Sequence, residues 1–548
     1  MSKFFIADPL HINKRNFGSL YEYLEESKAN AIFNEERKDW LSLFGDYSSH
    51  EQLLIEEYSY LRSLSQDEIF ELSVLEVNIF KVARAEILSL LITKENFNNA
   101  PLPTSRRKLF DFIFENAPNI LLWNMAAAIQ WINHWSPVIK QHNPKFVLVF
   151  SGSLIYARSL LELLKNRAPR AFVLESFFTG SDNYIEEKYE PIANNSNLKL
   201  KAYYRSLGSN ESPFERDRSR NKAINKILSG INKNVTQPPE DEKKLFNNSK
   251  KTVLITGQVL NDFSLLEYKD HGLNSLSFYK ELIQKILDQT EFNIIFKAHP
   301  WERKKKNITT PLTLDALASH FAVNDKYQDS SERLLLLEDY NIKSIFKQTE
   351  YVLGLNSQAL LEAAFEGFQP IQFANAFYGN RGFTSDYHPE NLELFVTDIK
   401  TGKIPSRLGI AQYRAYEEFM TKALQFSLIS AFPSGKAMLR TIFHITPPIS
   451  LVNKSAANQP VTQKAEKTAT PAKTATPVKV VKAQAQSTTP STSAAKASPP
   501  LPPTEKIAQS KRGKKMDKFL KTPKKFFLDS KNPRVRWLHI FFPKSTAK

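Results

Sequence analysis

The chain has 548 residues, of which 42% are hydrophobic and none is cysteine, so it can form two ordinary domains and holds no disulfide or thiolate metal site. Its net charge of +17 lies in the C-terminal part: residues 451–548 contain 21 Lys or Arg and 4 Asp or Glu, whereas residues 1–450 contain 53 of each sign. A neutral body with a basic tail predicts that the tail binds a polyanion. The sequence has no apolar run of about 18 residues and an early charge at Lys3, which argue against a transmembrane helix and a signal peptide. We therefore expect a cytoplasmic protein.

Residues 1–240 are predicted to form a Rossmann-like α/β domain that begins with a short strand at the N-terminus. Residues 20–135 carry Leu, Glu and aromatic residues at helical spacing and are predicted to be mostly helical. Residues 145–151 form an apolar run typical of a buried strand, and a helical pattern and a second strand at 171–175 follow. A strand, a helix and a strand within about 30 residues indicate a parallel sheet.

Residues 251–450 repeat the alternation of strands and helices and are predicted to form a second Rossmann-like domain. The polar and charged stretch 208–250 separates the two and reads as a linker, in part helical. Gly367 is expected to end a helix that starts near Ser357. The predicted strands cover residues 252–257, 292–297, 351–355 and 370–373.

The tail is predicted to have two parts. Residues 451–510 consist mainly of Ala, Thr, Pro, Lys and Ser, cannot bury a core and are expected to be a disordered tether. Residues 511–548 combine 13 Lys or Arg with Phe and Trp, which is typical of a basic amphipathic segment at a membrane surface. We expect peripheral attachment to the anionic inner membrane. Docking onto an acidic partner protein of an assembly complex is an alternative, and nucleic-acid binding is disfavoured because aromatic residues cluster with the charges.

Two Rossmann-like domains place a cleft at the carboxyl ends of their strands, where ligands of open α/β sheets bind. The first candidate site there is Gln258 with Asp262, just after the strand 252–257. The carboxylate of Asp262 is expected to face the cleft, although an Asp after a strand can also form an Asx turn or a helix cap. On the N-terminal side, Glu175 closes the strand 171–175 and is a candidate acid/base, or an ordinary strand-end charge.

A second group of candidates follows two later strands of the C-terminal domain. Lys297 and His299 end the strand 292–297, and the following Pro300 restricts the backbone, so the imidazole could donate to a phosphate or be a loop histidine without a task. Ser357 follows Asn356 and is expected to cap a helix whose amino end attracts anions.

Glu362 lies one turn into the same helix. Its carboxylate could reach a ribose, or it could be a solvent-facing helix charge.

The order and spacing of these residues resemble those of the bacterial capsule polysaccharide biosynthesis family, which includes β-Kdo transferases. The resemblance covers about residues 145–390, and Glu175 matches a Glu-terminated strand of that family. The motifs that carry it are Gln258-x-x-x-Asp262, Lys297-x-His299-Pro300, Asn356-Ser357 with Glu362, Gly367 and Pro370, and Tyr378-x-x-x-Gly382-x-Thr384-x-Asp386.

The resemblance implies a GT-B glycosyltransferase that moves Kdo or a related ulosonic acid from a CMP-sugar to a lipid-linked or oligosaccharide acceptor. By position, His299 and Ser357 would hold the CMP phosphate, Asp262 would lie near the anomeric carbon, and Glu175 would be the acid/base. Attack by Asp262 would retain configuration, and activation of the acceptor alone would invert it. No metal or other cofactor is expected, because the chain has no convincing Asp-x-Asp signature. A UDP-hexose donor and a non-catalytic adaptor of the assembly or export complex stay open as alternatives.

Overall fold

The computed structural model describes residues 3–99, 101–229, 237–304, 312–323, 327 and 332–444. The predicted tether and membrane segment therefore lie outside the described residues. Within the described ranges, no helix combines the length and the apolar character that crossing a membrane would require.

The first sheet has six strands, and four adjacent strands that extend from its middle to one edge are parallel, as the sequence predicts. The predicted strands at the N-terminus, 145–151 and 171–175 are confirmed. Two antiparallel strands at one edge and a parallel strand at the other were not predicted, because each is short or polar. In sheet order, the strands are β14 (Ile429–Ser430), β7 (Asp182–Glu187), β6 (Arg170–Ser176), β5 (Phe146–Phe150), β1 (Lys3–Ile6) and β2 (Asn30–Phe33).

Helices dominate the rest of the N-terminal half, as the helical spacing of residues 20–135 predicts. The longest is α7 (Pro118–His142), and one of its sides is buried. Trp131 and Trp135 lie on that side, are fully buried, and stack with ring centroids 5.0 Å apart. A small hairpin, β3 (Ser73–Val74) and β4 (Val77–Asn78), precedes α4. The helices are α1 (Gly18–Glu26), α2 (Glu51–Ser63), α3 (Gln66–Glu71), α4 (Ile79–Leu91), α5 (Glu95–Asn98), α6 (Arg106–Asn116), α7 (Pro118–His142), α8 (Ile155–Leu164), α9 (Lys201–Ser206) and α10 (Pro213–Ser229).

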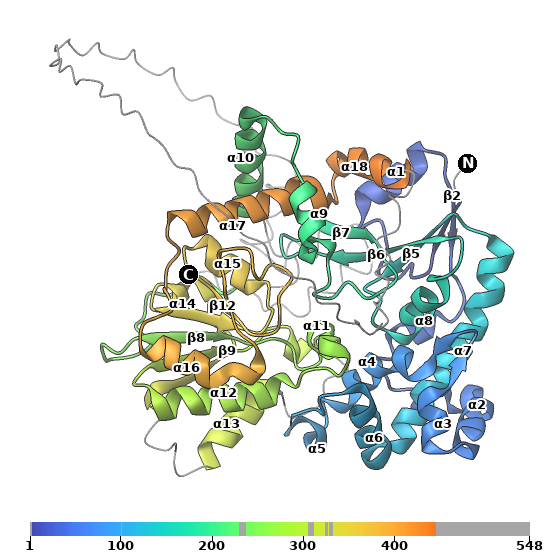
Figure 1. Cartoon of the computed structure of the whole chain (residues 1–548), viewed down its shortest axis with the longest axis horizontal. Coiled ribbons are helices and arrows are strands. Elements are labelled where there is room, and N and C mark those ends of the chain that lie inside the picture. Colours follow the sequence, from blue (N-terminus) through green and yellow to red (C-terminus); the bar gives the residue numbers. More distant parts are fainter. Residues whose placement is uncertain are drawn as a thin grey trace, which may run out of the picture. The chain divides into compact units, whose positions relative to one another are not determined.

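The second sheet is parallel throughout its six strands, which confirms the predicted doubly wound domain (Figure 1). Its order is β10 (Leu334–Leu337), β9 (Asn293–Lys297), β8 (Thr252–Thr256), β11 (Tyr351–Gly354), β12 (Ile371–Gln372) and β13 (Ser385–Asp386). Its helices are α11 (Phe263–Leu266), α12 (Ser275–Gln289), α13 (Thr313–Val323), α14 (Ile342–Phe346), α15 (Ala359–Phe365) and α16 (Leu392–Lys400).

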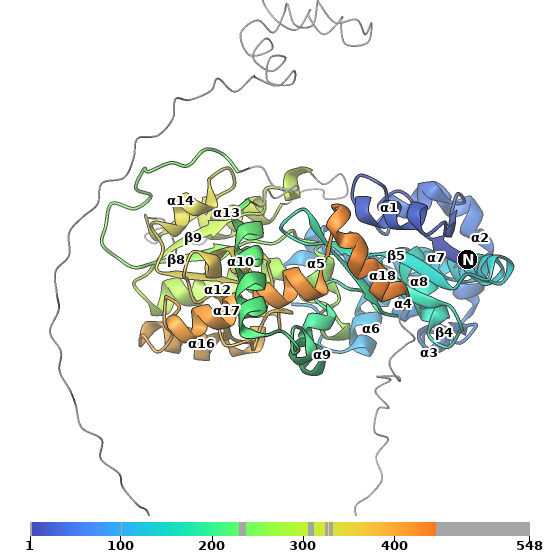
Figure 2. The same ribbon diagram turned by 90° about the horizontal axis from the view of Figure 1, so that it is seen from above.

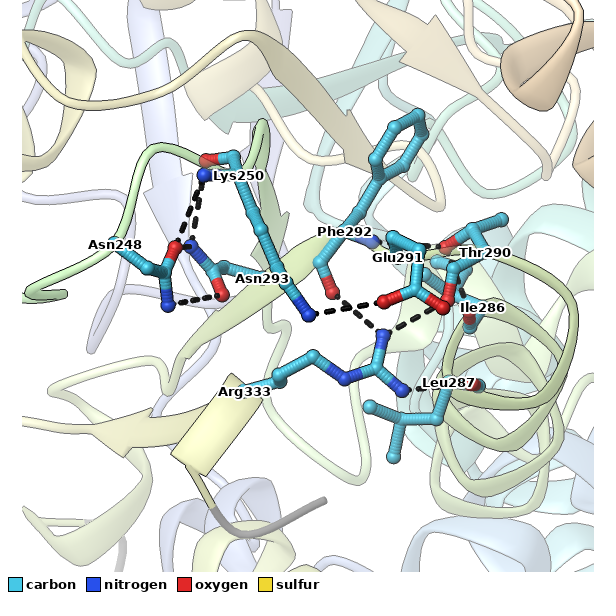
Figure 3. Close-up of polar contacts among 9 residues, drawn as sticks. All are labelled: Asn248, Lys250, Ile286, Leu287, Thr290, Glu291, Phe292, Asn293 and Arg333. Atoms are coloured by element: carbon cyan, nitrogen blue, oxygen red, sulfur yellow. Dashed lines mark hydrogen bonds and ion pairs between the residues drawn. The ribbon is translucent and has the colours of Figure 1, made fainter. Parts of the chain in front are cut away.

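A polar cluster at the amino ends of these strands joins α12 to β9 (Figure 3). The guanidinium of Arg333 donates to the carbonyl oxygens of Leu287, Thr290 and Phe292, at 2.8, 2.8 and 3.2 Å. These contacts satisfy carbonyls at the end of α12 that have no partner within the helix. The cluster therefore fixes one edge of the sheet and leaves the carboxyl edge for the site.

The last described segment returns to the first sheet, which corrects the predicted 251–450 domain. Helix α17 (Ile410–Lys422) leads to β14, which pairs antiparallel with β7, and α18 (Lys436–His444) packs against α1 (Figures 1 and 2). Phe443 stacks on Tyr23 with centroids 5.5 Å apart. The apolar side of α18 is buried on the first sheet, so the C-terminal end of the predicted domain belongs to the N-terminal one. Helix α10 lies within residues 208–250, which were predicted to form a partly helical linker, and it packs against α17.

The two sheets are held together beside the cleft by a buried ion pair. Arg84 of α4 is 2% exposed and donates to the Glu267 carboxylate at 2.6 Å and to the Leu266 carbonyl at 2.8 Å. On the same side, Asn261 donates to the Ser89 carbonyl at 3.2 Å. These contacts fix the short segment that follows β8 against the N-terminal helices.

Candidate functional site

A cavity of about 1740 Å³ lies between the two sheets, at the carboxyl ends of their strands. Its size exceeds that of a typical small-molecule pocket, which leaves room for two substrates. The structure brings every predicted site residue to its wall. They are Glu175, Gln258, Asp262, Lys297, His299, Asn356, Ser357 and Glu362.

Gln258 and Asn356 join the loops after β8 and β11. The Gln258 amide nitrogen donates to Asn356 Oδ1 at 2.8 Å, and the Asn356 backbone N–H donates to Gln258 Oε1 at 3.0 Å. Both side chains are buried, and Asn356 also accepts from the Ser264 hydroxyl at 2.9 Å. This reciprocal pair makes the two residues positioning groups for the wall of the cavity.

Asp262 lines the cavity and also caps a helix, so both interpretations of its position after the strand hold. Its Oδ1 accepts the Ser264 N–H at 2.9 Å and so caps α11, whereas Oδ2 accepts from the Gln258 amide at 3.2 Å. An aspartate that is held at both oxygens has a fixed orientation at the cavity wall. The cap and a role in chemistry are thus compatible.

Lys297 is the last residue of β9 and His299 follows the strand, as predicted, but the two side chains make different contacts. His299 Nδ1 accepts the Trp301 N–H at 3.1 Å, so the neutral ring carries its proton on Nε2 and can act as a donor. Lys297 is buried, and its ammonium donates to the carbonyl oxygens of Ala298 and Glu338, at 3.2 and 2.6 Å. Burial lowers the pKa of Lys297. Lys297 therefore ties two loops together at the wall.

The predicted cap at Ser357 is corrected. Helix α15 begins at Ala359 with Gln358 at its N-cap, and the Ser357 hydroxyl accepts the Ala359 N–H at 3.2 Å from one position further out. The loop bends there because Tyr378, a buried residue of the family motif, donates to the Ser357 carbonyl at 2.6 Å. Glu362 is half-buried and lines the cavity, where burial raises its pKa to about 7. Its contact with a ribose stays a prediction.

Glu175 ends β6 on the opposite wall. Its Oε1 accepts the Ser176 N–H at 2.9 Å, and the Ser151 hydroxyl bonds to the same carboxyl group. Ser151 has a φ of 57°, a left-handed conformation that is uncommon for a residue other than glycine and often marks a functional site. Burial raises the pKa of Glu175 to about 7, and the Asp262 carboxylate adds to the rise. The two predicted carboxylates thus interact across the cavity.

Two residues of this wall, Asp8 and His11, were missed from the sequence. Asp8 follows β1 and is fully buried, and its Oδ2 lies 2.7 Å from His11 Nδ1. His11 lines the cavity. Their three-residue spacing at the end of the first strand was the available signal, because an Asp after a strand can orient a nearby histidine.

The strands beneath the C-terminal wall of the cavity pack closely at Gly354 of β11. A Cβ at this position would overlap the Thr256 hydroxyl of the neighbouring strand. We expect Gly354→Ala to lower stability by about 1–3 kcal/mol, the cost of overpacking, and to weaken ligand binding by separating Gln258 from Asn356. Thermal unfolding of Gly354→Ala and of Gly354→Ala with Thr256→Ala tests this. The second change removes the hydroxyl and should restore part of the stability, and equal loss in both variants would contradict the explanation.

Among the described residues, no group of three or more His, Asp or Glu side chains has a geometry that could hold a metal ion. The expectation of a metal-independent reaction stays a prediction.

Comparison with known proteins yields one family. Residues 197–401 match the family described as "Capsule polysaccharide biosynthesis protein". No curated protein matches the chain.

Several solved structures are similar to the chain at low identity. The β-Kdo 2,4 transferase of Thermosulfurimonas dismutans KpsC is 15% identical over 52% of this chain and 81% of its own, with a TM-score of 0.37. For the β-Kdo 2,7 transferase of the same protein, the identity is 15%, the coverage 57% and 96%, and the TM-score 0.33. A UDP-GlcNAc 2-epimerase from Neisseria meningitidis is 11% identical over 80% of this chain and 98% of its own, with a TM-score of 0.27.

The matched segment 197–401 contains seven of the eight predicted residues at the cavity and the Tyr378 motif that shapes the Ser357 loop. The family match over this segment confirms the resemblance that the motifs indicate. Over residues 197–401, this chain is similar to the capsule polysaccharide biosynthesis family.

Proposed function

We propose that the protein is a glycosyltransferase of capsule or other surface polysaccharide biosynthesis, and that its donor is a CMP-activated ulosonic acid such as CMP-Kdo. One observation carries the proposal: the eight residues predicted from the family pattern, which come from both sheets, line a single cavity. An adaptor without catalysis has no need for carboxylates of both domains at one cavity.

On the C-terminal wall, we propose that His299 and the Ser357 loop hold the nucleotide phosphate. The Nε2–H of a neutral imidazole can donate to a phosphate oxygen, and the hydroxyl of Ser357 supplies a second donor. Preorganised donors at a departing phosphate stabilise the charge that develops on it. Glu362 is placed for contact with the ribose.

On the same wall, Asp262 would stabilise or attack the anomeric carbon, and Glu175, across the cavity, would take part in proton transfer on the acceptor side. The fixed orientation of Asp262 supports the first role, since positioning contributes much of the rate of a group transfer. A carboxyl group with a pKa of about 7 can exchange a proton at neutral pH, which supports the second.

The tail would bring the catalytic body to the membrane, where the body could reach a lipid-linked or oligosaccharide acceptor. We propose that the basic residues of 511–548 attach the protein to the anionic inner-membrane surface, because several Lys and Arg residues contribute about 1 kcal/mol each near such a surface. An acidic assembly partner would use the same charges.

The donor is tested by thermal unfolding of the full chain with CMP, UMP and GMP. We expect CMP alone to raise the unfolding temperature with concentration, because a ligand that binds only the folded state stabilises it. His299→Asn should lose most of this shift, since Asn can still accept from the Trp301 N–H but removes the Nε2 donor. His388→Asn, at an exposed histidine, is the matched control. A response to UMP alone would favour a UDP-hexose donor, and no response to any nucleotide would favour the adaptor.

A further inference from the structure

The N-terminal wall of the cavity contains a hydrogen-bonded chain of Tyr156, Asp8 and His11 that the family pattern does not include. The Tyr156 hydroxyl donates to Asp8 Oδ2, and His11 Nδ1 lies 2.7 Å from the same oxygen. Tyr156 is 2% exposed and Asp8 is fully buried, whereas the His11 side chain keeps 32% of its surface exposed. A buried carboxylate thus presents an imidazole to the cavity.

The imidazole of His11 has a fixed orientation. Its own backbone N–H donates to Asp8 Oδ1 at 3.0 Å, and the Ile12 N–H donates to the Asp8 carbonyl at 2.9 Å, which closes a turn directly after β1. The ring also stacks on Phe150 at the end of β5, with centroids 4.8 Å apart and an interplanar angle of 12°. Because a carboxylate only accepts hydrogen bonds, the proton between the two groups belongs to Nδ1. The neutral ring therefore has its lone pair on Nε2, and no residue that the structure describes bonds to that atom.

We propose that His11 is the base that removes the proton from the acceptor hydroxyl, and that Asp8 holds it in the required tautomer. This inference rests on the proposed function and moves the direct proton transfer from Glu175 to His11. The acceptor O–H bond breaks and its proton passes to Nε2. The electron pair of the acceptor oxygen forms the new bond to the anomeric carbon, whose bond to the leaving oxygen breaks with its pair retained by that oxygen. The leaving oxygen is that of the nucleotide phosphate, or of Asp262 where the sugar has first been transferred to it.

The charges around His11 suit a base that becomes positive. Asp8 and Glu175 both favour the imidazolium and raise the pKa of His11, although burial opposes the rise. Glu175 is itself held by Ser176 and Ser151, so its carboxyl group is placed to stabilise the imidazolium. Other ionisable groups of this part of the wall include the exposed Arg15, Tyr184 beside Glu175 and, through Asp8, Tyr156. An aspartate that orients a histidine through Nδ1 and stabilises its charged form performs the same task in Ser-His-Asp hydrolases.

The central test uses His11→Asn, which keeps an N–H toward Asp8 but has no basic nitrogen. Full-chain protein is given CMP-Kdo with methanol as a surrogate acceptor, and methyl glycoside and CMP are measured by mass spectrometry. We expect methyl glycoside formation to fall by about 10²–10⁴-fold, the usual contribution of a general base, while the CMP-induced rise in unfolding temperature is unchanged. His388→Asn is the control. In the wild type the rate should rise with pH, because the base must be neutral, and this limb should be absent in His11→Asn.

Two further variants separate a catalytic from a structural role. Added imidazole should restore part of the rate of His11→Ala and none of the rate of Asp8→Asn, whose ring is present in the wrong tautomer. Glu175→Gln should lower the rate less than His11→Asn and shift the pH limb to lower pH. A methyl glycoside rate in His11→Asn within about threefold of wild type, or an unchanged pH limb, would overturn the inference. A wild-type protein that neither binds CMP nor turns over CMP-Kdo would instead refute the proposed function.

Discussion

Asp262→Asn should yield a folded protein that transfers sugar at least about 10²-fold more slowly, the scale for loss of one preorganised electrostatic group. The cap is retained, because asparagine caps helices as well as aspartate does and can keep the contact with the Ser264 N–H. The acceptor for the Gln258 amide is lost together with the charge. What it removes is the negative charge that faces the anomeric carbon in the proposed site. The measurement is the rate of CMP release from CMP-Kdo, with the CMP-induced shift in unfolding temperature recorded on the same protein.

Asp262→Ala completes the experiment by removing the cap together with the charge. We expect it to lose about 1 kcal/mol of stability beyond that of Asp262→Asn, with a similar loss of rate. If Asp262→Asn turns over normally while Asp262→Ala does not, Asp262 serves only as the cap of α11, and the carboxylate near the sugar must be sought elsewhere in the cavity.

Arg84→Met should cause the largest loss of stability among these variants. It removes one partner of a buried pair and leaves Glu267, which is 13% exposed, with Arg158 at 3.8 Å as its remaining ion-pair partner among the described residues. Breaking a buried ion pair in this way costs about 3–5 kcal/mol. Because Arg84 also bonds the Leu266 carbonyl at the end of α11, the segment that begins at Asp262 should loosen, and the rate should fall with the stability.

Denaturant unfolding of Arg84→Met beside Lys269→Met measures this. Lys269 pairs with Glu390 at the surface, where both side chains are about half exposed, and such pairs contribute about 0–1 kcal/mol. Equal midpoints for the two variants would show that the Arg84 pair does not hold the N-terminal helices to the segment after β8.

The central strands of both sheets and the polar residues that follow them could be predicted from the local sequence. The apolar runs at 145–151, 252–257 and 292–297 became central strands because a strand buried on both faces needs little beyond its own side chains. The polar residues after those strands reached one cavity because carboxyl ends of parallel strands share an edge. The edge strand β14 escaped prediction because it is short and its partner β7 lies far away in the chain. Strand β7 pairs with the neighbouring β6, but its acidic and polar residues do not form the apolar run of a buried strand.

Only the tertiary structure decided what these residues touch. Lys297 and Ser357 occupy predicted positions, but the carbonyl of Glu338 and the hydroxyl of Tyr378 set the directions of their groups, and both partners are distant in sequence. Helix α18 returns to the first sheet because its apolar side is buried there. The sequence shows that this side must be covered, but not which apolar surface covers it. The Asp8–His11 pair has a local spacing, yet its place in the cavity depends on Tyr156, Phe150 and Glu175, which the first sheet and its helix α8 bring there from distant positions in the chain. Spacing fixes which groups can meet, whereas packing fixes the dielectric surroundings and orientation from which their chemistry follows.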